Sequence, residues 1–112
     1  MTGIVVKAAY ATVAEEDGQI FVGFVDARDE SYALFRQPKA GGALWFEVND
    51  EDFGAEDAIE SASLGPDGLT LILRPTCAGR FGYASSVAIR LKNCEDTEPA
   101  LTRLRGMGLP GV

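Results

Sequence analysis

Hydrophobic and polar residues alternate along much of the chain with a period of two, which is typical of β-strands. The segment SYALFRQ shows this well, since Tyr32, Leu34 and Arg36 fall on one face of an extended chain. Many of the alternating segments are also rich in β-branched and aromatic residues, which fit a pleated surface. The pattern predicts about seven strands, at Ile4–Val13, Gln19–Ala27, Ser31–Gln37, Ala43–Val48, Ala58–Leu64, Leu69–Arg74 and Tyr83–Leu91.

Turn residues separate these segments and indicate how some of them connect. Gly65-Pro66-Asp67-Gly68 is a strong turn signal, so the strands on either side of it are predicted to form a hairpin. A second hairpin is predicted around the acidic turn that ends at Gly18. The segments Asn49–Asp57 and Pro75–Gly82 are expected to be loops.

The segment Asn93–Gly106 predicts a helix, because acidic residues lead and arginines trail, which complements the helix dipole. A helix this short is stable only when it docks on other structure. The predicted fold class is α+β, mainly β. It is a single β-rich domain over residues 1–112, with a twisted antiparallel sheet or two packed sheets and the helix against one face. The absence of βαβ alternation argues against a parallel sheet.

The charge balance disfavours two classes of partner. The chain has 17 acidic and 10 basic residues, a formal net charge of -7. Nucleic acids and anionic membranes are bound through clustered Lys and Arg, so neither is an expected partner. Arg90 and Lys92 share a strand face, but two charges predict no basic patch.

Missing residue types narrow the chemistry further. The chain has no histidine, which removes the commonest general base and the commonest metal ligand. With no cofactor motif either, we expect no catalysis, no metal and no cofactor. Cys77 and Cys94 have no CxxC spacing, and the N-terminus does not resemble a signal peptide. These features predict free thiols and a cytoplasmic location.

One stretch carries the whole excess of negative charge. Outside it, ten acidic residues balance the ten Lys and Arg. Such a concentration favours a docking surface for a cationic protein over general solubilisation, although a solvated loop remains the simpler reading. Its seven carboxylates, with no base among them, are Glu47, Asp50, Glu51, Asp52, Glu56, Asp57 and Glu60.

Two other readings of this acidic run stay open. A calcium loop needs a regular series of oxygen ligands, but Gly54 comes one residue too soon and Ser61 stands where a bidentate Glu is required. A glycosidase needs two carboxylates at a set separation, which a sequence cannot measure. The chain is also small for a sugar cleft.

Aromatic residues accompany the acidic run. Trp45 shares a strand face with Glu47, so partial exposure is expected. Aromatic anchors beside charges are typical of protein interfaces, although core packing is the simpler explanation for each residue alone. Phe53, inside the run, either anchors its loop or protrudes toward a partner.

The central segments SYALFRQP and ALWFEVNDEDFGAEDAIESASLGPDGLTLIL resemble the immunity protein 10 family of bacterial toxin–immunity systems. The likeness covers residues 31–74 and lies in strand patterning and a few polar positions. The resemblance implies a protein that neutralises a cognate, cationic toxin domain by direct binding. We therefore predict a partner-binding surface made of Trp45, Glu47, Asp50, Glu51, Asp52, Phe53, Glu56 and Asp57.

Two alternative functions remain at this stage. One is a small enzyme that uses carboxylates or a divalent metal ion. The other is a structural module that oligomerises through exposed strand edges. The sequence leaves the oligomeric state open.

Overall fold

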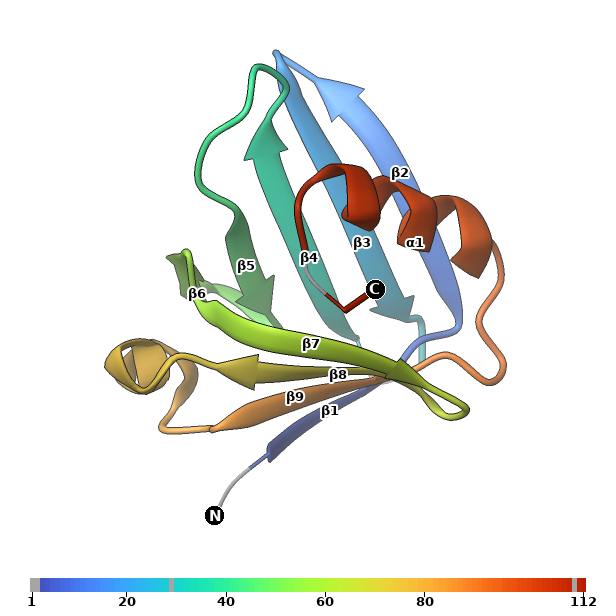
Figure 1. The fold of residues 1–112 in the computed structure, drawn as a ribbon. Helices are drawn as coiled ribbons and strands as arrows, with labels where there is room; N and C mark the ends of the chain where they lie inside the picture. The colour runs from blue at the N-terminus through green and yellow to red at the C-terminus, as the bar shows by residue number, and fades with distance from the viewer. Residues whose placement is uncertain (1–2, 29, 110) are drawn as a thin grey trace.

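The computed structural model describes residues 3–28, 30–109 and 111–112, and it is mainly β, as the sequence predicts. The described residues form nine strands, a 3₁₀-helix η1 (Pro75–Phe81) and the helix α1 (Thr97–Gly106) (Figure 1). The strands are β1 (Gly3–Lys7), β2 (Tyr10–Glu16), β3 (Gln19–Asp26), β4 (Ser31–Pro38), β5 (Trp45–Val48), β6 (Asp50–Glu56), β7 (Ile59–Gly65), β8 (Gly68–Leu73) and β9 (Ser86–Arg90).

The strands form two sheets that share one hydrophobic core. The five-stranded sheet has the order β2-β3-β4-β5-β6, in which all neighbours are antiparallel. The four-stranded sheet has the order β1-β9-β8-β7, in which β1 and β9 are parallel. Figure 1 shows the four-stranded sheet running across the five-stranded one, with α1 over the rest of its inner face. The helix thus packs on a sheet face, as expected.

The predicted strand Ile4–Val13 is in fact two strands, which is one reason that the count is nine rather than seven. The backbone changes sheets at Ala8 and Ala9. The Ala8 amide donates to the Arg90 carbonyl beside β1, whereas the Ala9 amide donates to the Val25 carbonyl in β3. The sequence pattern does not show this change of sheet, because the residues on both sides of it favour strands.

The predicted loop Asn49–Asp57 is also wrong, since β6 occupies most of it. The strand pairs with β5 through its backbone, with a bulge between Glu47 and Val48. Because β6 is an edge strand with mostly exposed side chains, it does not show the alternation of a half-buried strand. The predicted loop Pro75–Gly82 likewise contains the helix η1, which ends at Gly82 with a φ of 63°.

Other sequence predictions are confirmed. The hairpin β7–β8 closes at the expected turn, where Gly65 pairs with Gly68, and β2–β3 is the first hairpin. Cys77 and Cys94 are free thiols. No helix among the described residues has the length and apolar character needed to cross a bilayer.

Four phenylalanines form the centre of the core on the inner face of the five-stranded sheet. Phe24, Phe35 and Phe46 come from neighbouring strands, and Phe81 comes from η1. Successive ring centroids lie 6.1, 4.9 and 5.8 Å apart, within the range of favourable aromatic pairs. Because the aromatic core fills the inner face of β5, the alternate residues Trp45 and Glu47 point to the outer face.

The helix α1 closes the core from the other side. Ala100, Leu101 and Leu104 are buried, in agreement with their predicted helical spacing. Arg103 forms an ion pair with Glu15 of β2, which also pairs with Lys39 at 3.0 Å. These two cations, Lys39 foremost, hold the pKa of Glu15 below its usual value. The helix begins four residues later than the sequence predicts.

Candidate interface on the outer face of the five-stranded sheet

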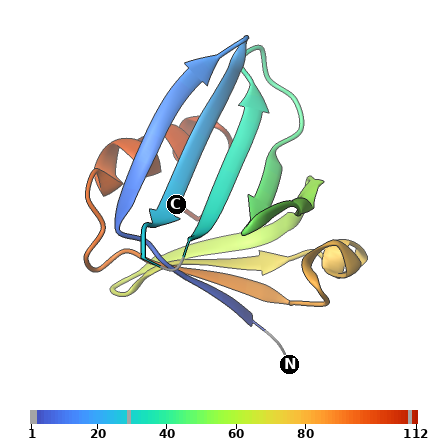
Figure 2. The ribbon, with the colours of Figure 1, turned by 180° about the vertical axis from the view of Figure 1, so that it is seen from behind.

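Among the described residues, no helix or strand covers the outer face of the five-stranded sheet (Figure 2). Figure 2 shows this face toward the viewer, with α1 behind the sheet. The strand register places a row of half-buried side chains across it, since Phe21 pairs with Arg36 and Arg36 pairs with Trp45. Glu56 of β6 ends the row opposite Trp45. Aromatic, cationic and acidic groups therefore lie next to one another on this face.

Trp45 is held from two sides. The Arg36 guanidinium carbon lies 5.0 Å from the centroid of the Trp45 ring, which is a cation–π geometry. On the other side, the indole lies over Gly54 of β6. A Cβ at Gly54 would stand 2.5 Å from Trp45 Cζ2 and 2.9 Å from Glu47 Cβ. Only glycine leaves room for the indole here, so Gly54 fixes the position of Trp45.

Glu47 is the buried polar centre of the same face, with only 6% of its surface exposed. The Trp45 Nε1–H donates to its Oε1 at 2.8 Å, and the Tyr32 hydroxyl donates to its Oε2 at 2.5 Å. Burying a carboxylate is costly unless it is hydrogen-bonded, and here each oxygen has a donor. Glu47 therefore orients Trp45 and Tyr32, and it presents little surface to a partner.

Tyr32 titrates abnormally because of this environment. Burial raises the pKa of the phenol well above its usual value, and the hydrogen bond to Glu47 raises it further. The charges of Asp50 and Glu51 act in the same direction. The raised pKa keeps the phenol protonated, and a donor to Glu47, at alkaline pH where an ordinary tyrosine ionises.

The acidic run divides into separate groups in the fold. Asp50, Glu51, Asp52 and Glu56 are exposed on β6, and no ion pair within the described residues neutralises them. Asp57, by contrast, pairs with Arg74 at 3.4 Å. Four of the predicted binding residues therefore lie on one edge strand, the acidic edge (Asp50, Glu51, Asp52 and Glu56), and Glu56 pairs with Trp45.

Phe53 lies in β6 rather than in a loop, and its side chain is partly packed and partly exposed. Its ring lies close to Gly82 at the end of η1, where a Cβ would stand 3.8 Å from Phe53 Cε2. It nevertheless keeps 43% of its surface exposed. Nearby, the Arg80 Nε–H donates to the Gly54 carbonyl at 3.2 Å. The helix η1 thus covers part of the free edge of β6, which reduces its capacity to pair with another strand.

Sequence reasoning missed three residues of this constellation: Tyr32, Arg36 and Gly54. The alternation in SYALFRQ does place Tyr32 and Arg36 on one face. Their proximity to Trp45 and Glu47 depends on the register between β4 and β5, which the sequence pattern does not give. The role of Gly54 depends on the strand β6, which was predicted as a loop.

The described residues contain no group of three or more His, Cys, Asp or Glu side chains arranged to hold a metal ion. Comparisons with known proteins add no relative, since no family model matches the chain and neither a curated protein nor a solved structure is significantly similar to it.

Proposed function

We propose that this chain is an immunity-type binding protein, which neutralises a cationic bacterial toxin domain by direct contact. The contact surface is Trp45 together with the acidic edge of β6. The observation that carries the proposal is a half-buried tryptophan, fixed by Arg36, Gly54 and Glu47, next to the edge strand β6. This strand carries four exposed carboxylates that form no ion pair with the described part of the chain.

Physical chemistry supports a protein partner for this surface. Tryptophan and tyrosine are enriched among the residues that dominate binding energy, and rigid aromatic anchors lose little entropy on binding. The uncompensated carboxylates favour a positively charged partner and accelerate its association. The resemblance of residues 31–74 to the immunity protein 10 family supplies the kind of partner, a toxin domain.

A small carboxylate enzyme receives less support from this geometry. Glu47 already uses both oxygens within the protein, and the acidic edge lies on an edge strand. A general acid or base needs a free oxygen within reach of a bound substrate. The alternative predicts a rise in melting temperature with calcium, magnesium or manganese, which thermal unfolding checks.

The function can be tested by co-expression with the products of adjacent genes. We expect one of these products to be a basic domain that arrests growth alone and is neutralised when it binds this chain. Failure of every adjacent product to bind the chain, or binding without protection, would contradict the proposal.

Matched variants locate the contact. Asp52→Lys lies in the acidic edge, and Glu16→Lys makes the same charge change on β2 at the opposite edge of the same sheet. We expect Asp52→Lys to slow association by about tenfold or more at low salt, and Glu16→Lys to change it little. Equal effects of the two variants would show that only net charge matters.

A further inference from the structure

A cavity separate from the acidic edge lies where β1 leads into β2 and β9 leads toward α1. The cavity has a volume of about 550 Å³, which falls in the range of small-molecule sites. The cationic residues that line it come from three segments far apart in sequence, namely Lys7, Arg28, Arg90 and Lys92. The sequence brings only Arg90 and Lys92 together, and the fold adds Lys7 and Arg28 to the same cavity lining.

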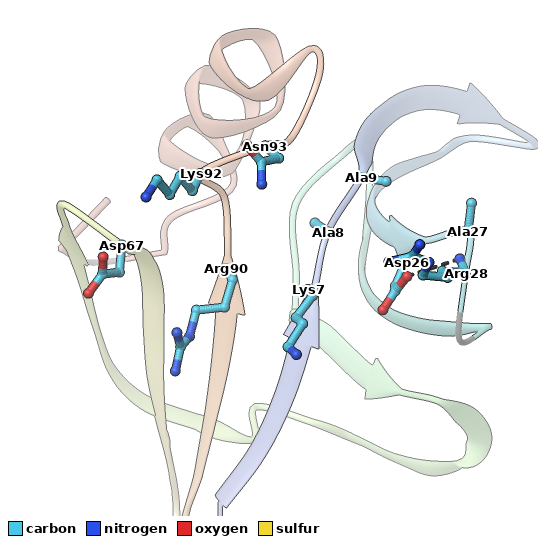
Figure 3. A pocket seen from close by; sticks show the side chains of 10 residues that line it. All are labelled: Lys7, Ala8, Ala9, Asp26, Ala27, Arg28, Asp67, Arg90, Lys92 and Asn93. Carbon is cyan, nitrogen blue, oxygen red and sulfur yellow. Dashed lines mark hydrogen bonds between the residues drawn. The ribbon is translucent and has the colours of Figure 1, made fainter.

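Two of these cations are direct neighbours. Lys7 of β1 and Arg90 of β9 are register partners in the parallel pair, and Figure 3 shows them side by side. Like charges at paired positions of a sheet repel and destabilise it. No ion pair within the described residues joins Lys7, Arg28, Arg90 or Lys92 to a carboxylate. In a chain with a large acidic excess, such a group is well placed to bind an anion.

The two carboxylates of the lining stand to either side of the cations. Figure 3 shows Asp67 on one side of the Lys7–Arg90 pair and Asp26 with Arg28 on the other. Asp26 is buried, and its Oδ1 accepts the backbone N–H of Arg28 at 3.0 Å. These flanking carboxylates disfavour a broad acidic surface more than a compact anion held at the Lys7–Arg90 pair.

The uncharged residues of the lining indicate what the rest of the ligand is. Ala8, Ala9 and Ala27 supply small apolar side chains, and Asn93 supplies an amide. The described lining residues include no aromatic ring on which a nucleobase could stack. A phosphate group carries close to two negative charges and accepts several charge-assisted hydrogen bonds from Lys and Arg. The small alanines leave space for a compact skeleton, and the Asn93 amide can hydrogen-bond to its hydroxyl groups. The lining therefore favours a small hydroxylated ligand over a nucleotide.

We propose that this cavity binds a small phosphorylated metabolite without an aromatic ring, such as a sugar phosphate, with Lys7 and Arg90 holding the phosphate. The site lies at β1 and β9, away from the acidic edge on β6, and it does not depend on the function proposed for that edge.

Isothermal titration calorimetry of the full chain tests the proposal. The probes are inorganic phosphate, glucose 6-phosphate, glucose and hexaglutamate. We expect saturable binding of inorganic phosphate and tighter binding of glucose 6-phosphate, with none for glucose. Absence of saturable phosphate binding would overturn the proposal. Tighter binding of hexaglutamate than of either phosphate ligand would also overturn it, in favour of an acidic peptide.

Substitutions in the cavity lining test whether the ligand binds there. Arg90→Gln and Lys7→Gln should each weaken glucose 6-phosphate binding by about tenfold, since each removes a charged donor. Lys39→Gln is the matched control, because Lys39 is an exposed cation that pairs with Glu15 outside the cavity. Asp67→Asn should strengthen binding by removing a repelling charge. Unchanged affinity in both Arg90→Gln and Lys7→Gln would overturn the assignment.

Discussion

The acidic edge of β6 and the cationic cavity beside β1 and β9 arise in different ways. The acidic edge comes from one short stretch of sequence and carries carboxylates that β6 displays together. The cavity collects its cations from the end of β1, the segment after β3 and the segment around the end of β9. The acidic edge lies on β6 of the five-stranded sheet, whereas Lys7 and Arg90 lie on β1 and β9 of the four-stranded sheet. A net charge of -7 therefore conceals a separation of charge that only the fold reveals.

The two regions also differ in how they are supported. Beside the acidic edge, the side chains are interlocked, because Glu47 bonds both Tyr32 and Trp45 while Gly54 receives the indole. In the cavity, the Lys7 and Arg90 side chains are exposed, and they repel each other. We therefore expect substitutions near β6 to cost stability, and substitutions in the cavity to affect stability little.

The largest effect is expected from Gly54→Ala. Its Cβ would meet the Trp45 ring at 2.5 Å, so the indole or the β5–β6 pairing must shift. We expect a loss of about 3 kcal/mol in the free energy of unfolding, at the upper end for overpacking, measured by urea denaturation. Gly65→Ala is the control, since nothing lies within 4 Å of the added Cβ. Equal stability of both variants would mean that the indole is not held over Gly54.

Tyr32→Phe should cost about 1.5–3 kcal/mol, the range for a hydrogen bond to a charged group. The variant removes the donor to Glu47 Oε2 and leaves that oxygen without its partner. The measurement is the urea midpoint at neutral pH. A midpoint equal to that of the wild type would show that Glu47 does not rely on the phenol.

The same phenol predicts a dependence on alkaline pH. An unfolded tyrosine loses its proton near pH 10, whereas the pKa of Tyr32 is raised in the folded chain. Its contribution to stability is complete below about pH 10 and declines above it, because the unfolded chain releases the proton first. Above about pH 10, stability should therefore fall more steeply in the wild type than in Tyr32→Phe. Identical slopes would contradict a raised pKa.

The smallest effect is expected in the cavity. Lys7→Gln relieves the repulsion from Arg90 and should raise the free energy of unfolding by a few tenths of a kcal/mol at low ionic strength. High salt should remove this gain, because it screens exposed charges. Urea denaturation at both ionic strengths checks the prediction. A loss of stability at low salt would indicate that Lys7 is a structural residue.

Much of the fold follows from local pattern. The hairpin β7–β8 rests on one turn sequence, and the helical face of α1 rests on the spacing of Leu101 and Leu104. The break at Ala8–Ala9 could not be predicted in the same way, because it is a change of hydrogen-bond partner within a continuous β pattern. The strand β6 was not predicted, because its side chains are mostly exposed and do not alternate between buried and exposed positions.

The candidate site was predictable only in part. Trp45 and the carboxylates of β6 are close in sequence, so their proximity was foreseeable. The burial of Glu47 was not, since it requires Tyr32 and the register of β4 against β5. The pairing of Asp57 with Arg74 and the clustering of Lys7 with Arg90 are likewise contacts between distant segments.

The separation of the two charged regions can be measured most directly by amide chemical shifts of the full chain during two titrations. Hexalysine should perturb the amides of β6 and leave the cavity unchanged, while glucose 6-phosphate should perturb residues 7–9, 26–28 and 90–93 and leave β6 unchanged. Perturbation of the same residues by both probes, or saturable binding of neither, would contradict the account.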